Sequence, residues 1–272
     1  MICMRSKWVV NLLLIFIGLL FLVPLIWVLT AAFSANPSLA VQWPSPITIN
    51  NFKGVLTSQN GRAFINSFYL SFGTAIVTVV LAMLAAYPLS RYNLRFKKSF
   101  LYTILFATGL PITAMMVPVY EIFNRLNMVN SLVWTGAFLV SSSLPYGIWM
   151  MKNFMDGVPV ELEEAAWVDG ASVLKALITV ILPLMRPALA AIGIFIFVGA
   201  WGNFFVPFIL IQTSSLDPAS VTIYQFFSQY GMVEYGQLAA YSILYAIPVV
   251  VLYVIASKWL GGAFKFGGAM KA

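Results

Sequence analysis

The chain has 272 residues, of which 61% are hydrophobic and 8% are charged, and its formal net charge is +7. Soluble domains carry about 25% charged residues, so this composition excludes an ordinary soluble protein and indicates an integral membrane protein. The sequence has no His, one Cys and no Walker A pattern, which excludes an internal disulfide and disfavours metal and acid–base chemistry. We therefore predict no catalytic residue, no metal site and no cofactor bound by this chain.

Long apolar runs indicate that the chain crosses the membrane several times. Lipid offers the backbone no hydrogen-bond partners, so only helices or a closed barrel can span it, and a barrel would show alternating segments about ten residues long. The runs here are unbroken and about twenty residues or longer, which favours helices. We expect an all-α integral membrane protein with about six spans, at residues 8–33, 63–90, 99–123, 132–151, 188–212 and 238–260.

Most Lys and Arg residues fall on one side of this six-span topology. Only Lys53, Arg62 and Arg125 fall on the other side. The larger group consists of Arg5, Lys7, Arg91, Arg95, Lys97, Lys98, Lys152, Lys175, Arg186, Lys258, Lys265 and Lys271. Since an excess of Lys and Arg marks the cytoplasmic side, both termini are expected in the cytoplasm. Topology then explains the net positive charge, and nucleic-acid binding is not expected.

The acidic residues are concentrated in the connection between the fourth and fifth spans, residues 152–187. Five of the eight lie there, at Asp156, Glu161, Glu163, Glu164 and Asp169. Because acids are favoured in the first turn of a helix, we expect Glu161 and Glu163 to be solvated or to complement the helix dipole. Anionic lipid headgroups disfavour an acidic helix on the membrane surface. A helix that docks on a protein is therefore preferred, and a helix that lies on lipid is the alternative.

The same connection predicts two helices separated by a glycine turn. Ala165 and Ala166 are strong helix formers in the first helix. Gly170 can adopt the left-handed conformation that ends a helix, and Ser172 can cap the next one. The second helix has apolar residues at helical spacing and is expected to end at Pro183.

Residues 164–183 resemble the EAA motif, E-A-A-x3-G-x9-I-x-L-P, of the transmembrane subunits of bacterial ABC importers. The matching residues are Glu164, Ala165, Ala166, Gly170, Leu182 and Pro183, with Val180 in the place of Ile. Other segments are similar to the MalG-like branch, namely WPSPITINNFKGVL (43–56), AYPLSRY (86–92), LPITAMMVPVYEIFNRLNMVNS (110–131), LPYGIWMMKNF (144–154) and WGNFFVPFIL (201–210). Over most of its length the chain thus resembles a carbohydrate ABC permease.

This resemblance implies a MalFG-type permease fold, with residues 1–272 as one transmembrane domain in the cytoplasmic membrane of a bacterium or archaeon. It implies a second homologous permease, an ABC ATPase dimer that uses ATP and Mg, an extracytoplasmic binding protein, and a sugar or oligosaccharide as substrate. Residues 152–187 would be the coupling loop. In it Glu164 would contact the ATPase, Ala165 and Ala166 would permit close approach, and Gly170 would form the turn. The expected coupling site is completed by Asp169, Leu182 and Pro183.

Two further segments have alternative interpretations. Residues 213–236 form an outer loop whose aromatic cluster either contacts the binding protein or packs on the spans as a re-entrant lid. That cluster consists of Tyr224, Phe226, Phe227 and Tyr230. Residues 261–272 form a cytoplasmic tail, which is either a frayed terminus or a segment that inserts into the ATPase dimer.

Polar and aromatic residues within the spans are candidates for the substrate path: Asn66, Thr113, Ser141, Ser142, Ser143, Tyr146, Trp201, Asn203 and Tyr241. A sugar needs hydrogen-bonding groups and an aromatic face, and Trp201 beside Asn203 offers both. A packing role is nevertheless preferred for each residue, because Ser and Thr usually join spanning helices and Tyr and Trp often mark the membrane interface. Glu121 is expected at the outer end of its span, since a carboxylate at mid-bilayer costs about 2.5–3.5 kcal/mol.

Other functions stay open beside the sugar permease. A permease for a non-sugar solute, such as glycerol-phosphate, a polyol or an amino sugar, would share the EAA motif. The scarcity of basic residues in the spans disfavours an anionic solute. A membrane-embedded enzyme or an ion-coupled carrier would need ionisable groups within the spans, and the sequence offers almost none there.

Overall fold

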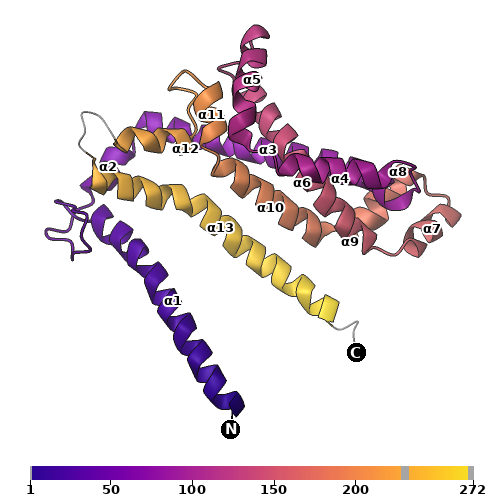
Figure 1. Cartoon of the computed structure of the whole chain (residues 1–272), viewed down its shortest axis with the longest axis horizontal. Helices are drawn as coiled ribbons and strands as arrows, with labels where there is room; N and C mark the ends of the chain where they lie inside the picture. The colour runs from indigo at the N-terminus through magenta and orange to yellow at the C-terminus, as the bar shows by residue number, and fades with distance from the viewer. Residues whose placement is uncertain (1, 228–232, 269–272) are drawn as a thin grey trace. The chain divides into compact units, whose positions relative to one another are not determined.

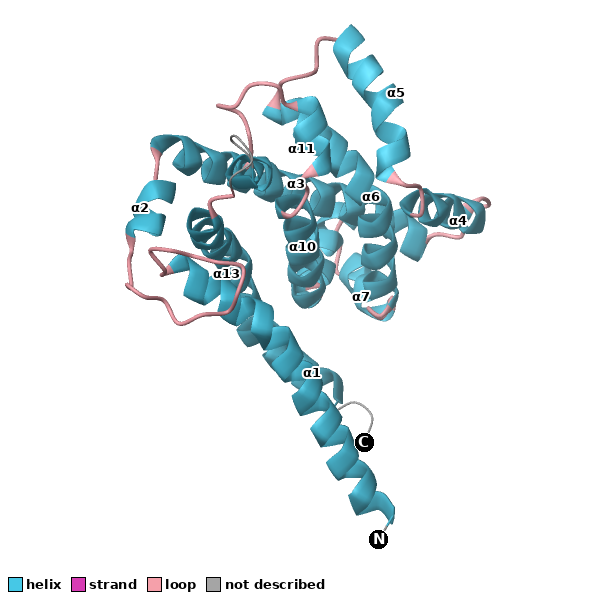
Figure 2. Ribbon diagram, turned by 60° about the vertical axis from the view of Figure 1, so that its left-hand side comes forward, coloured by secondary structure: helices cyan, strands magenta, loops and turns pink. Residues whose placement is uncertain are grey.

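The structure is a computed structural model, which describes residues 2–227 and 233–268. The described residues are mostly helical, as Figure 2 shows, and their only β-type pairing is an isolated bridge between Ser34 and Ile47. The expected all-α fold class is therefore confirmed.

The chain divides into two compact units, each made of two stretches of sequence: residues 1–61 with 222–248, and residues 62–221 with 249–272. Two of the three boundaries fall within long helices, α3 (Ser58–Arg91) and α13 (Tyr235–Gly268), and the third falls within the short helix α12 (Ala219–Thr222). The expectation of a single domain over residues 1–272 stays a prediction.

The first unit contains α1 (Ile2–Ala32), α2 (Asn50–Val55), the 3-10 helix η2 (Ile223–Phe227) and the first part of α13. From residue 10 onward α1 is strongly apolar, and none of its most apolar window is buried within the chain. A helix that is apolar on all sides and long enough to cross a bilayer is typical of a membrane span. α1 thus agrees with the expected first span.

The end of α1 is joined to α2 by one amide side chain. The Asn51 side-chain nitrogen donates hydrogen bonds to the backbone carbonyls of Ala32 at 3.0 Å and Ser34 at 2.8 Å. The rings of Phe33 and Phe52 lie beside this contact, with centroids 5.0 Å apart. These bonds satisfy carbonyl groups that the end of a helix leaves without intrahelical partners.

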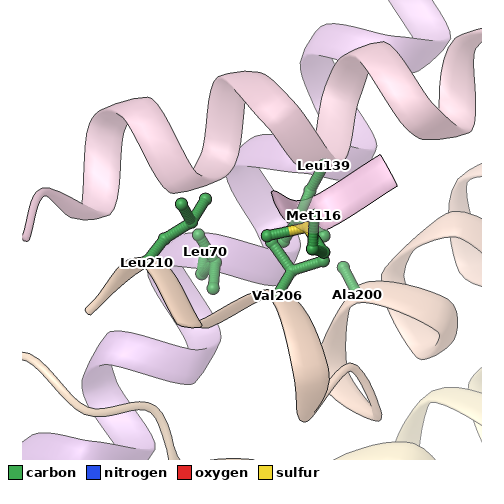
Figure 3. Close-up of a cluster of buried hydrophobic side chains, with 6 residues drawn as sticks. All are labelled: Leu70, Met116, Leu139, Ala200, Val206 and Leu210. Atoms are coloured by element: carbon green, nitrogen blue, oxygen red, sulfur yellow. The ribbon is translucent and has the colours of Figure 1, made fainter. Parts of the chain in front are cut away.

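The second unit is a group of packed helices built from α3, α4 (Lys97–Thr108), α5 (Ile112–Arg125), α6 (Leu132–Asp156), α10 (Arg186–Trp201) and α11 (Phe205–Leu210). α6 packs against α4 and α10, and α11 packs against α5 and α6 (Figure 1). One apolar cluster joins five of these helices (Figure 3), and its members are Leu70, Met116, Leu139, Ala200, Val206 and Leu210. This cluster fixes how α5 and the short helix α11 are held.

The expected third span, residues 99–123, is not one helix. α4 ends at Thr108, α5 begins at Ile112, and the two helices are bent by 94°. Pro111 accounts for the break, because proline has no N–H to donate and disfavours helical backbone at the residue before it. The expected third span is therefore a bent pair of helices, and whether the pair crosses the membrane as one span stays a prediction.

The expected fifth span, residues 188–212, is also interrupted. α10 ends at Trp201 and α11 begins at Phe205. The side-chain oxygen of Asn203 accepts a hydrogen bond from the backbone N–H of Val206 at 3.0 Å, so Asn203 helps to start α11. The expected span contained Gly202 and Asn203, but the apolar residues on both sides of them concealed this turn.

By length and apolar composition, three of the described helices can cross a membrane, namely α1, α3 and α13, or up to five spans if each bent helix pair counts as one. α6 was expected as the fourth span and has 25 residues, but it is not among these helices. Three serines in its middle and charged residues at its end lower its hydropathy. The six-span count and the sides of the termini stay predictions.

The outer loop and the tail contain more helix than the sequence indicated. Within the loop lie α12 (Ala219–Thr222) and η2, while Tyr230 of the expected aromatic cluster lies outside the described residues. The tail expected from residue 261 continues α13 as far as Gly268. Residues 269–272 lie outside the described part of the chain.

Candidate functional site

The acidic connection folds into a short helix and a glycine turn, as predicted. α7 (Glu161–Val168) carries three glutamates in its first turn, where the helix dipole favours negative charge. Gly170 has a φ of +83°. Its N–H donates to the carbonyl of Trp167 at 3.0 Å, and the N–H of Ala171 donates to that of Ala166 at 2.9 Å. This pair of bonds is the Schellman motif, which ends a helix at a left-handed residue.

The second predicted helix starts at its expected cap. The Ser172 side chain accepts a hydrogen bond from the backbone N–H three residues later, at 3.4 Å, and α8 (Val173–Ala176) follows. The helix then widens into a π-helical turn, η1 (Leu177–Ile181), before α9 (Leu182–Leu184). Pro183 removes one ordinary backbone hydrogen bond at this point, which accounts for the change in helical geometry.

The residues of the expected coupling site divide into two groups by exposure. The exposed group, which we name the coupling edge, consists of Glu164, Ala165, Asp169 and Gly170. The half-buried group consists of Ala166, Leu182 and Pro183. A Cβ atom added at Gly170 would meet no atom within 4 Å, so the backbone conformation requires glycine there and the available space does not. The coupling edge is therefore accessible to a partner protein.

Glu163 is fully buried, although it stands beside the exposed Glu164. One carboxylate oxygen accepts a hydrogen bond from Nε of Arg91 at 2.7 Å, and the other accepts one from the Tyr87 hydroxyl. Glu163 lies in the first turn, where its charge complements the helix dipole as expected, but it is not solvated, because the Arg91 guanidinium balances its charge inside the protein. The partners are 72 residues apart in the sequence, and no local pattern pairs them.

Arg91 also binds the end of α6 and the chain that follows it. Its Nη1 donates to the Met155 carbonyl at 3.2 Å, and its Nη2 donates to the Val158 carbonyl at 3.1 Å. The neighbouring Ser90 hydroxyl donates to the carboxylate of Asp156, the last residue of α6, at 2.7 Å. We use the name anchor network for Tyr87, Arg91 and Glu163 with these two carbonyls. The network joins α3, α6 and α7 at one end of the second unit.

Two of the expected substrate-path residues hold the outer loop. The Asn66 side chain donates to the backbone carbonyls of Ser215 at 3.1 Å and Asp217 at 3.2 Å. The backbone carbonyl of Asn203 accepts a hydrogen bond from the Ser220 hydroxyl at 2.9 Å. Both asparagines thus have structural partners that the sequence did not indicate.

Several of the other path candidates pack within the helices. Trp201 is 3% exposed and stacks on Phe197 with centroids 5.7 Å apart, so its ring is not presented to a solute in this structure. Tyr146 lies against Phe195 at 4.7 Å. The Ser142 hydroxyl donates to a backbone carbonyl of its own helix at 3.0 Å. These contacts favour the packing interpretation of each residue, and their role in a substrate path stays a prediction.

Of the remaining candidates, Ser141 lines a cavity between α3 and α6, while Tyr241 lies in α13 and Thr113 in α5. Tyr241 belongs to the first unit, where it is fully buried with its ring centroid 5.1 Å from that of Phe226. Thr113 and Glu121 are exposed on α5.

Burial raises the pKa of the Asp217 carboxyl in the outer loop above its ordinary value of 3.8.

Comparison with known proteins then identifies the family. Residues 78–261 match the model of the family described as binding-protein-dependent transport system inner membrane component, which is more than half of the chain. The chain belongs to this family. As a permease of this kind, it is the membrane component of an ABC transport system, as the resemblance implied.

Two relatives cover most of the permease. It is 29% identical over 254 residues to the sulfoquinovosyl glycerol transport system permease protein SmoH of Agrobacterium fabrum, across 91% of this chain and 88% of SmoH. It is 30% identical over 250 residues to the diacetylchitobiose uptake system permease protein DasC of Streptomyces coelicolor, across 88% of each chain.

A solved structure shares the fold. It is a chain of a bacterial ABC transporter involved in the import of the acidic polysaccharide alginate, with a TM-score of 0.80 and 22% identity. The alignment covers 94% of this permease and 96% of that chain. The expected ABC permease fold is thereby confirmed.

Proposed function

We propose that this permease is the membrane subunit of an ATP-driven importer that moves a sugar or an oligosaccharide into the cell. SmoH and DasC support this substrate class, because both are named for the uptake of sugar-containing solutes. The family description adds a dependence on a binding protein and a place in the inner membrane. The scarcity of basic residues in the apolar segments agrees with an uncharged solute.

The observation that carries the coupling role is the exposed coupling edge on a short acidic helix. The chain has no Walker A pattern, so the energy for transport comes from a partner that binds ATP and Mg. In this proposal Glu164 makes a charged contact with that ATPase, and the small side chain of Ala165 lets the two surfaces approach. A second permease completes the substrate path, and an extracytoplasmic binding protein delivers the solute.

The proposed mechanism is alternating access driven by the ATPase. The ATPase dimer has two states, and ATP favours the closed state. A permease that docks differently on the two states is shifted between its own two conformations by that difference in affinity. The coupling edge is where this difference acts on the permease.

The test is gentle detergent extraction of the tagged permease from its native membrane, followed by mass spectrometry of the proteins that co-purify. Wild type should retain an ABC ATPase and a second permease. Glu164→Ala should lower the retained ATPase about tenfold or more, because it removes a charged contact at an interface. Glu161→Ala is the matched control, since Glu161 is exposed on the same helix outside the EAA motif. Equal retention in Glu164→Ala and wild type would refute the docking role.

The substrate class has its own test. Membrane vesicles that contain the whole importer are supplied with ATP and with each member of a panel of radiolabelled monosaccharides and oligosaccharides. ATP-dependent accumulation of at least one of them is expected. If ATP drives uptake only of solutes that are not carbohydrates, the sugar assignment is wrong.

A further inference from the structure

The attachment of α7 to the rest of the second unit is unusual for a helix in an apolar protein. Of its eight residues, only Glu163 is buried. The apolar side chains of Leu162, Trp167 and Val168 are 44%, 37% and 88% exposed. Leu162 and Trp167 are thus only partly covered, and the carboxylate side chain of Glu163 is the one side chain of α7 that is fully buried.

The partner of that carboxylate is bonded at every nitrogen of its guanidinium. Arg91 donates a hydrogen bond from Nε to Glu163 on α7. It donates two more, from Nη1 to the Met155 carbonyl on α6 and from Nη2 to the Val158 carbonyl in the segment between α6 and α7. The exposed fraction is 4% for the Arg91 side chain and 1% for that of Glu163. The planar fork of arginine fixes several acceptors in one geometry, which the single ammonium group of lysine cannot do.

A buried ion pair of this kind is better suited to fixing a geometry than to adding stability. Taking two charges out of water costs about as much as their attraction returns, so apolar residues of similar size are often equally stable. The network instead sets the distances between the ends of three helices. Glu163, the member of the anchor network on α7, directly precedes Glu164, the proposed contact with the ATPase.

We propose that Glu163 is the positioning residue of the coupling loop, which makes α7 move as one body with the adjoining ends of α3 and α6 through Arg91 and Tyr87. This role rests on the proposed docking of α7 on an ATPase. Glu164 meets the partner, and Glu163 passes the displacement of α7 to the helices of the membrane domain. Without the anchor network α7 can still dock on the ATPase, but its displacement is no longer passed fully to α3 and α6.

The experiment measures the distance between α7 and the end of α3 in the complex purified from the membrane. Cys3, the only cysteine, is changed to Ser, and spin labels are placed at Asn93→Cys and Val168→Cys. Both positions are exposed, the first just beyond α3 and the second on α7. Pulsed electron paramagnetic resonance should give a narrow distribution of distances that stays narrow when ATP and orthovanadate are added.

Two single variants test the network in this background. Glu163→Gln keeps the shape and removes the charge, and Arg91→Lys keeps the charge and removes the fork. Each should broaden the distance distribution about twofold or more, because α7 then opens locally at low cost. Glu161→Gln is the control on the same helix and should leave the distribution narrow. Narrow distributions in both single variants would overturn the proposal.

A double variant separates positioning from folding. Arg91→Met combined with Glu163→Leu replaces the buried pair with apolar side chains, so the yield of folded complex should match wild type. The distribution should stay broad, because the bonds to the carbonyls of Met155 and Val158 are lost. A narrow distribution in this variant would show that the network only fills space. Failure of the docking role itself would appear separately, as unchanged ATPase retention in Glu164→Ala.

Discussion

At the scale of single residues, the coupling loop shows two different reasons for residue identity. Gly170 is needed for its backbone, since its φ of +83° is in the left-handed region and no atom crowds its Cα. Glu163 is needed for a distant partner, since its charge is balanced by Arg91. The first reason is local and was predicted, while the second depends on the tertiary structure.

Substitution of Gly170 by Ala should destabilise the turn after α7. A left-handed conformation costs an alanine about 1–2 kcal/mol relative to glycine. The expected result is weaker ATPase retention on purification, with faster hydrogen exchange at the end of α7. Gly199→Ala is the control, because Gly199 is in α10 and its added Cβ would also meet no atom within 4 Å. If both alanine variants behave like wild type, the left-handed turn has no energetic role.

The raised pKa of Asp217 predicts a pH dependence of stability. The folded state holds the proton more tightly than the unfolded state, so burial of the charged form destabilises the fold at high pH. As pH rises from 3.8 through the raised pKa, wild type should lose stability relative to Asp217→Asn, and the difference should then stay constant. Thermal unfolding of both proteins in detergent, from about pH 3 to about pH 7, measures it. A difference that is independent of pH would contradict the burial of this carboxyl.

At the scale of elements, the helices are interrupted where local chemistry meets tertiary packing. The break between α4 and α5 has a local cause at Pro111, which the apolar residues on either side concealed in the hydropathy pattern. The turn before α11 is different, since the side-chain oxygen of Asn203 accepts a hydrogen bond from the Val206 N–H while its backbone carbonyl accepts one from the Ser220 hydroxyl. Only the folded chain shows that both the side-chain oxygen and the backbone carbonyl of Asn203 accept hydrogen bonds.

The position of α5 should depend on its one buried methionine. Met116 is 1% exposed within the cluster that joins α5 to α6 and α11. Met116→Ala should lower the free energy of unfolding by about 2–5 kcal/mol, because it leaves a cavity. The adjacent Val117 is 68% exposed, and Val117→Ala should change the free energy by no more than about 0.5 kcal/mol. Denaturant titration in mixed micelles measures both, and equal effects would place α5 outside the core.

At the scale of the whole molecule, the distribution of charge predicts how the permease lies in the membrane. From the basic residues we expect the turn after α3 to lie in the cytoplasm and the loop after α11 to lie outside. In the Cys3→Ser background, a membrane-impermeant maleimide should label Ser214→Cys in intact cells. Asn93→Cys should react only after the membrane is opened. The reverse pattern would invert the topology, and labelling of both in intact cells would contradict the number of crossings between them.

The sequence by itself determined what depends on near neighbours along the chain. Apolar runs indicated membrane helices, spacing indicated a resemblance to the EAA motif, and glycine and serine at fixed offsets predicted the turn and the cap that the structure contains. The tertiary structure decided what depends on contacts between distant segments: the burial of Glu163, its bonds to Arg91 and Tyr87, and the packing of Trp201 on Phe197. A charge in the first turn of a helix is expected to be solvated from any local pattern. The burial of Glu163 is possible in free energy only because Arg91, 72 residues away in the sequence, balances its charge.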